Sequence, residues 1–166
     1  MTGPELVVRP IGHEEVREAA NVLASAFSDD PIFEFILGDR KDTHVRLGHL
    51  FRDAARAELR RPAHLVETVE SGNAVALWHE VDAWEMGPMA LARSLPSVVK
   101  AFGTRLPRAL NVITSAEKVH PPEPHRHLAY IGTQKGDEGN GLGSALMQSM
   151  LERCDAEGTL YLPGKH

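Results

Sequence analysis

The pattern of apolar and polar positions in the first half of the chain predicts a strand, two long helices and a β-hairpin. Residues 6–10 are a short apolar run that ends at a proline, as expected for a short strand. Apolar residues recur at helical spacing over 13–27 and again over 41–60. Two more apolar runs, 64–69 and 74–78, flank a Glu-Ser-Gly-Asn sequence, so we expect two strands joined by a tight turn.

A short helix is predicted between the two long ones. Asp30 is a typical N-cap residue, and Pro31 suits the first helical position. The residues that follow, 32–36, are strongly apolar and would pack in a core. The charged residues of 41–60 are expected on the solvent-exposed face of their helix.

The second half is predicted to contain two helices, a buried strand and a third helix. Helical spacing over 89–102 and 106–119 favours an inserted helical pair over a long loop without structure. Residues 127–133, with the sequence His-Leu-Ala-Tyr-Ile-Gly-Thr, are typical of a buried strand. Apolar residues return at helical spacing from Leu142, and Gly158 is a typical residue just beyond a helix end.

The turn between that strand and that helix predicts an anion-binding site. Residues 134–141 are polar and rich in glycine, and the first amides of the following helix have no partner inside it. Glycines at 139, 141 and 143 allow a bulky anion to approach the backbone, and the helix dipole favours negative charge there. The turn is therefore interpreted as a phosphate cradle, with an ordinary glycine-rich helix cap as the alternative.

Two common phosphate motifs do not fit this turn, and a third does. The dinucleotide sequence Gly-x-Gly-x-x-Gly fails at its last position, which is Ser144. The P-loop spacing runs from Gly136 to Gly141, but Leu142 stands where the lysine is required. Residues 138–146, Glu-Gly-Asn-Gly-Leu-Gly-Ser-Ala-Leu, instead resemble the pyrophosphate-binding motif Gln/Arg-x-x-Gly-x-Gly/Ala of GCN5-related N-acetyltransferases.

This resemblance implies an α/β (α+β) fold with a mixed, mostly antiparallel central sheet flanked by helices. The helical pair would be an insertion between the third and fourth strands. A single domain over 1–166 is expected, and residues 159–162 would begin a fifth strand where family members continue through a further helix and strands. The domain is thus expected to lack the usual last strands. Because the family places its first helices at the acceptor pocket, residues 32–36 either pack in the core or form a wall of that pocket.

The resemblance also implies acetyl-CoA as the co-substrate. The central strand would bind the pantetheine arm and present the Ile131 amide to the thioester oxygen, while the turn would bind the pyrophosphate. The expected cofactor-binding residues are Ile131, Gly132, Thr133, Gly139, Asn140, Gly141, Leu142, Gly143 and Ser144. Glu138 stands at the family's glutamine or arginine position, and its charge should weaken binding if it faces the phosphates.

Acetyl transfer to an amine also needs a group that removes a proton, because amines are mostly protonated near neutral pH. Near the family's site, the expected catalytic residues are Glu80 and Tyr130, with His125 and His127 as further candidates. The nine histidines show no spacing typical of a zinc site, so no metal is expected.

The composition of the chain argues against a nucleic-acid-binding, membrane-spanning or secreted protein. The net charge of −5 shows no basic excess, which argues against a nucleic-acid partner. No apolar stretch resembles a membrane span or a signal peptide, so a cytoplasmic location is expected. The single cysteine, Cys154, lies on the apolar side of its helix and is expected in the core.

Two functions from different classes therefore remain. The first is an N-acetyltransferase that transfers an acetyl group from acetyl-CoA to a small-molecule or protein amine by direct attack. The second is a degenerate acyl-CoA-binding or regulatory module that does not turn over. The strand, turn and helix favour the first, whereas Glu138 and the missing strands favour the second. An unfinished sheet edge would also allow pairing with a second copy as a homodimer.

Overall fold

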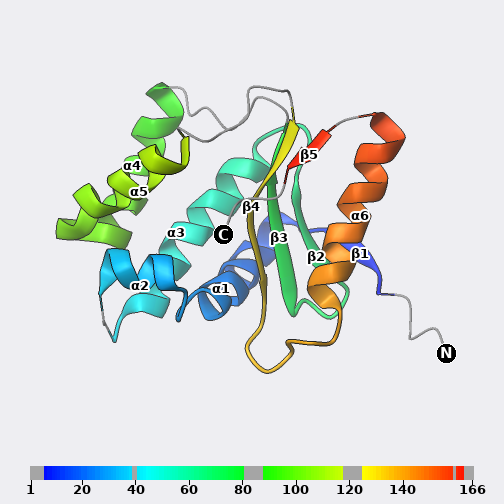
Figure 1. Ribbon diagram of the computed structural model, residues 1–166, viewed down its shortest axis with the longest axis horizontal. Helices are drawn as coiled ribbons and strands as arrows, with labels where there is room; N and C mark the ends of the chain where they lie inside the picture. The colour runs from blue at the N-terminus through cyan, green and yellow to red at the C-terminus, as the bar shows by residue number, and fades with distance from the viewer. Residues whose placement is uncertain (1–5, 39–40, 81–87, 118–124, 159, 163–166) are drawn as a thin grey trace.

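The structure is a computed structural model, and it describes residues 6–38, 41–80, 88–117, 125–158 and 160–162. In these ranges a single sheet lies between helices on both of its faces (Figure 1). The end of the helix predicted at 106–119, residues 118–119, lies outside the described residues.

The sheet follows the order of the chain. Its strands are β1 (Val8–Pro10), β2 (Val66–Val69), β3 (Ala74–His79), β4 (His125–Thr133) and β5 (Leu160–Leu162), each paired with the next. The first four are antiparallel, and β5 runs parallel to β4. The expected mixed, mostly antiparallel sheet flanked by helices is therefore confirmed.

Helices cover the two faces unequally. On one face lie α1 (Val16–Ala26), which follows the 3-10 turn η1 (His13–Glu15), and α3 (Thr43–Leu59). On the other face α6 (Leu142–Glu157) lies alone against the strands (Figure 1). Each helix supplies an apolar stripe, so the sheet separates two cores.

The two cores follow from the two-residue period of a strand. In β3, Val75 and Leu77 pack into the α1–α3 core, whereas Ala76 and Trp78 pack beneath α6. Cys154 is 2% exposed in this second core, which confirms its predicted place.

The inserted helices pack against α3 rather than on the sheet. They are α4 (Pro88–Phe102), the 3-10 turn η2 (Gly103–Arg105) and α5 (Leu106–Glu117), between β3 and β4 as expected. Phe102 and Ala109 join the α1–α3 core. The insertion thus thickens one side of the molecule and leaves α6 uncovered by it (Figure 1).

The short helix α2 (Pro31–Leu37) begins as the sequence predicts. Asp30 Oδ1 accepts hydrogen bonds from the amides of Ile32 and Phe33, at 2.9 and 3.2 Å. Phe33 is buried in the core, whereas Ile32 and Phe35 are 43% and 60% exposed. One side of this apolar helix therefore packs in the core, and the other side faces outward.

An irregularity in β4 determines which side chains face α3. Opposite β3, Leu77 pairs with Tyr130 but Trp78 pairs with Leu128, so Ala129 is an extra residue. Such a bulge lets two neighbouring side chains point to one face. Ala129 and Tyr130 both pack on the α1–α3 core, while Leu128 packs beneath α6.

One feature of α3 differs from the sequence prediction. Its charged residues were expected on the solvent-exposed face, but Glu58 in the last turn is only 1% exposed. The prediction is wrong at this position because partners from outside the helix, Arg61 and His79, contact the carboxylate. A buried carboxylate needs such partners to offset its loss of hydration.

Candidate functional site

The start of α6 leaves backbone donors without a cap. Gly141 is the N-cap residue with a φ of 77°, a conformation that glycine adopts without strain, and no side chain caps it. The first helical hydrogen bond runs from the Ala145 amide to the Gly141 oxygen. The amides of residues 142–144 therefore point out of the helix end with no acceptor inside the helix.

The outer edge of β4 is open next to this helix start. β5 pairs with β4 only at His125, Arg126 and His127. Among the described residues, no strand pairs with the outer edge of 128–133, which we call the open edge. This edge runs from the last β5 contact down to the glycine-rich turn (Figure 1).

Two amides of β4 point toward the open edge. The Gln134 amide donates to Asn73 on the β3 side, at 2.7 Å. Because successive residues of a strand alternate their hydrogen-bonding direction, the Gly132 amide also points to β3. The amides of Ile131 and Thr133 point the other way, toward the open edge.

The helix start and the open edge lie close together. A methyl group placed on Gly143 would lie 3.9 Å from Thr133 Oγ1 and 4.0 Å from Ile131 Cδ1. The strand and turn residues predicted for the cofactor therefore meet around the first turn of α6. Because residue 143 is glycine, no side chain of its own lies between the first turn and this part of β4.

Gly132 has a different environment from the other predicted residues. A Cβ there would lie 2.7 Å from Ala26 Cβ and 3.3 Å from Leu23 Cδ2. This contact is on the α1 face, away from the start of α6. Close packing of α1 on β4 therefore explains why residue 132 is glycine, independently of any role in cofactor binding.

Side chains of the turn fold back onto the protein. Glu138 Oε2 accepts from the Gly136 amide at 2.6 Å, and Asn140 Nδ2 donates to the Asp137 oxygen at 3.1 Å. Lys135 Nζ donates to Ser28 Oγ at 2.7 Å and to the Asp29 carboxylate. The Lys135 ammonium keeps the pKa of Asp29 below its usual value. The turn is thereby fastened to the end of α1, with a carboxylate beside the glycines.

Tyr130 lies in an aromatic cluster on the α3 face of β4. Its ring meets Phe27 and Phe51 edge-on, with centroids 5.9 and 4.9 Å apart. Burial raises the pKa of the Tyr130 hydroxyl. The hydroxyl therefore stays protonated near neutral pH, so it suits proton donation better than proton removal.

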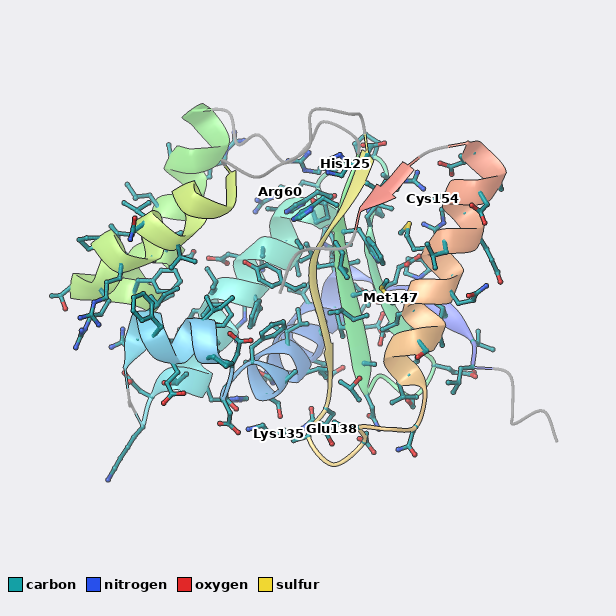
Figure 2. The ribbon with its side chains drawn as sticks, in the orientation of Figure 1. Arg60, His125, Lys135, Glu138, Met147 and Cys154 are labelled. Atoms are coloured by element: carbon teal, nitrogen blue, oxygen red, sulfur yellow. The ribbon has the colours of Figure 1, made fainter. Side chains whose placement is uncertain are left out.

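The other predicted proton-transfer residues lie at the opposite end of β4 from the turn. Figure 2 shows His125 at the start of β4, whereas Lys135 and Glu138 lie in the loop after its end. Glu80 directly follows β3, whose last residue His79 is opposite His127. Of the predicted catalytic residues, Tyr130 is therefore adjacent to the binding residue Ile131, whereas Glu80, His125 and His127 lie at the far end of the strand pair.

Sequence reasoning missed two residues at this end. Glu58 Oε2 lies 3.1 Å from His79 Nδ1, and the His79 and His127 rings are nearly parallel with centroids 6.2 Å apart. His127 in turn meets His125 edge-on at 6.3 Å. The pairing of β3 with β4 brings these imidazoles together, and spacing along the chain gives no sign of it.

A surface cavity of about 320 Å³ lies elsewhere, between α1 and the turn that joins β2 to β3. Its walls include Glu15, Glu18, Asn73 and Gln134. The two carboxylates would repel a diphosphate. We therefore do not assign a nucleotide to this cavity.

The described residues hold neither a membrane-spanning helix nor a cluster of metal ligands. No described helix combines the length and the apolar character needed to cross a bilayer. Across the described part of the chain, no three His, Cys, Asp or Glu side chains gather as ligands for one metal ion. The sites above rest on backbone amides and on hydrogen-bonded side-chain pairs.

Solved structures with a fold similar to that of this chain include two acetyltransferases. One is a histone acetyltransferase HPA2 and related acetyltransferase from Corynebacterium glutamicum, with a TM-score of 0.62, 24% identity, and coverage of 90% of this chain and 72% of that one. The other is arylalkylamine N-acetyltransferase 2 from Aedes aegypti, with a TM-score of 0.61, 12% identity, and coverage of 92% and 72%. No protein-family model matches the chain. At these identities the likeness establishes the acetyltransferase fold.

Proposed function

We propose that the protein is an N-acetyltransferase that transfers an acetyl group from acetyl-CoA to an amine. The observation that carries this proposal is the uncapped start of α6 beside the open edge of β4. Unpaired amides at the first turn of a long helix suit a diphosphate, and the strand edge suits the amide-containing arm attached to it.

In this proposal, the amides of residues 142–144 bind the pyrophosphate, and Gly139 and Asn140 complete the turn around it. Ile131 and Thr133 present their amides along the open edge to the pantetheine arm. The Ile131 amide is placed to donate to the thioester oxygen, where negative charge develops during attack. Gly132 contributes by allowing β4 to lie close against α1.

The chemistry also needs a proton acceptor and a proton donor. Tyr130 is proposed as the donor to the departing sulfur, because its raised pKa keeps the hydroxyl protonated. The sequence offers Glu80 as the acceptor for the proton of the ammonium group. The acceptor substrate is proposed to be a small-molecule or protein amine that approaches from the α3 face.

One observation favours a second candidate, a module that binds acyl-CoA without turnover. The Glu138 carboxylate lies beside the glycines at the place where the resemblance expects a neutral or basic residue. Its charge opposes a bound diphosphate. Weak binding without transfer would follow if the carboxylate stays in place.

Calorimetry with coenzyme A and acetyl-CoA tests both candidates on the purified chain. Binding is expected, together with a rise in melting temperature that grows with ligand concentration. Thiol release in the presence of a panel of primary amines then separates the two. Release supports the transferase, whereas binding without release supports the module, and no binding at millimolar ligand contradicts both.

A further inference from the structure

We propose that Glu58 and His79 together form the base that removes the proton from the amine. This assignment rests on the proposed acetyl transfer. The pair joins the last turn of α3 to the last residue of β3, with Glu58 Oε2 3.1 Å from His79 Nδ1. The Glu58 side chain is 1% exposed and the His79 side chain is 30% exposed. A buried carboxylate thus supports an imidazole that reaches the surface.

The contact determines which nitrogen of His79 is free to react. A carboxylate oxygen only accepts hydrogen bonds, so the ring nitrogen that faces it carries a hydrogen. In the neutral ring, Nε2 then keeps its lone pair for an incoming proton. A carboxylate that holds an imidazole in this tautomer also stabilises the imidazolium that forms, as in hydrolase triads.

The charge of Glu58 does not require a protonated His79. Arg61 Nε lies 3.3 Å from the same carboxylate oxygen, so a guanidinium already balances the buried charge. The Glu58 charge is therefore paired whether or not His79 has accepted a proton. Among the described residues, Glu58 and His127 contact the His79 ring, Arg61 contacts the same Glu58 oxygen, and His125 contacts His127.

The position of His79 fits the path proposed for the cofactor. His79 is opposite His127, so it lies level with the upper end of the open edge, but on the β3 side of β4. Tyr130 is opposite Leu77, two residues before His79 in β3, so Tyr130 and His79 lie near each other on the α3 side of the sheet. An amine that approaches the thioester proposed at Ile131 from the α3 face therefore comes in on the side of the sheet that carries this pair.

The proton path balances without another reactant. The ammonium group of the acceptor gives one proton to His79 Nε2, directly or through a water molecule. The neutral amine then forms the new nitrogen–carbon bond, and the carbon–sulfur bond breaks. The second proton of the amine passes to the departing sulfur through the Tyr130 hydroxyl. The imidazolium returns the first proton to solvent.

The kinetic test compares His79→Gln with a control that makes the same change elsewhere. The control is His44→Gln, because His44 lies in the first turn of α3 and its side chain is exposed. Loss of a general base typically lowers the rate 10²- to 10⁴-fold, and kcat/KM of His79→Gln should fall by roughly this factor at pH 7. The deficit should narrow as the pH approaches the pKa of the amine itself, where the substrate is already neutral. Coenzyme A affinity should change less than about twofold in both variants.

Glu58 is a positioning residue and has its own readout. In Glu58→Gln, the imidazolium that forms during the reaction loses its anionic neighbour and is less stable. The acid limb of the pH–rate profile should therefore move to lower pH, a change that a merely structural role would not produce. His79 is partly exposed, so His79→Gln should fold even if the buried Glu58→Gln change lowers stability.

Several outcomes would overturn the assignment. A loss in His79→Gln of less than about threefold would do so, because general bases contribute far more. So would a large loss in Glu80→Gln with normal His79→Gln activity, or an acid limb that does not move in Glu58→Gln. Coenzyme A binding without thiol release would contradict the assignment of the base but would still support the proposed cofactor site. If coenzyme A does not bind at all, both the proposed function and this assignment are contradicted.

Discussion

The starts of α2 and α6 use the same backbone chemistry in opposite ways. At α2, the Asp30 carboxylate accepts from two amides and satisfies them within the protein. At α6, Gly141 provides no side chain, and the first-turn amides are not capped. Both starts are specified by short local sequences. One is complete as folded, and the other can be completed by an external anion.

The difference shows how a helix start can be kept available for a ligand. A glycine in place of a capping side chain costs only a few tenths of a kcal/mol, so an uncapped start at Gly141 carries a small cost. The structure offsets that cost with the apolar side of α6, where Leu146 and Met150 are fully buried. Stability of α6 therefore comes from packing, which leaves its first turn free to bind.

The largest expected effect comes from filling the space at the start of α6. Gly143→Val places branched carbons between the first turn and the open edge, so coenzyme A affinity should fall about tenfold or more, roughly 1.4 kcal/mol. Calorimetry measures this. Gly143→Ala is the control, because its methyl would sit at ordinary contact distance, 3.9 Å from Thr133 Oγ1. Equal affinity in Gly143→Val and the native protein would place the diphosphate elsewhere.

At the capped start of α2, a substitution should change stability and leave coenzyme A affinity unchanged. Asp30→Ala should lower the free energy of unfolding by about 1 kcal/mol, because two amides of α2 lose their acceptor. Chemical denaturation measures this loss, and coenzyme A affinity should stay unchanged. Asp30→Asn should retain most of the stability, since the asparagine oxygen can also cap. A full loss in Asp30→Asn would show that the charge matters more than the acceptor.

A smaller effect is expected from the charge beside the uncapped start. Glu138→Gln removes an anion near the expected diphosphate, so coenzyme A should bind about two- to fivefold more tightly, as for a typical exposed charge of 0.3–1 kcal/mol. Asp155→Asn, in the last turn of α6, is the matched control for a lost surface carboxylate. Unchanged or weaker binding in Glu138→Gln would show that Glu138 does not face the phosphates.

The smallest effect concerns Glu15, whose carboxylate accepts a hydrogen bond from the Gly12 amide at the start of η1, and this effect disappears in acid. The Arg9 side chain, with the Gly12 amide, lowers the pKa of Glu15 from 4.5 to about 2. Because the folded pKa is depressed, the stability that the carboxylate contributes is present above about pH 4.5 and is lost as the pH falls toward 2. Melting temperatures of the native protein and Glu15→Gln should therefore differ near neutral pH and converge by about pH 2. A constant difference would contradict the role of the charge.

Features set by neighbouring residues could be predicted from the sequence. The Asp30 cap, the strand at 125–133 and the helix that begins at Leu142 all lie within two residues of their expected positions. Each depends on the conformational preferences of a few adjacent residues. The Glu58–His79 pair could not be predicted in this way, because 21 residues separate its members. Helical periodicity alone assigned Glu58 to solvent.

The sequence by itself determined the strand, the glycine-rich turn and the helix, since glycine conformations and helix-end hydrogen bonds act over a few residues. Only the tertiary structure decided that the described β5 residues pair with 125–127 of β4, and that Gly132 serves the packing of α1. It also decided that a buried glutamate supports His79. These features depend on contacts between segments far apart in the chain, and no local pattern encodes which segments will meet.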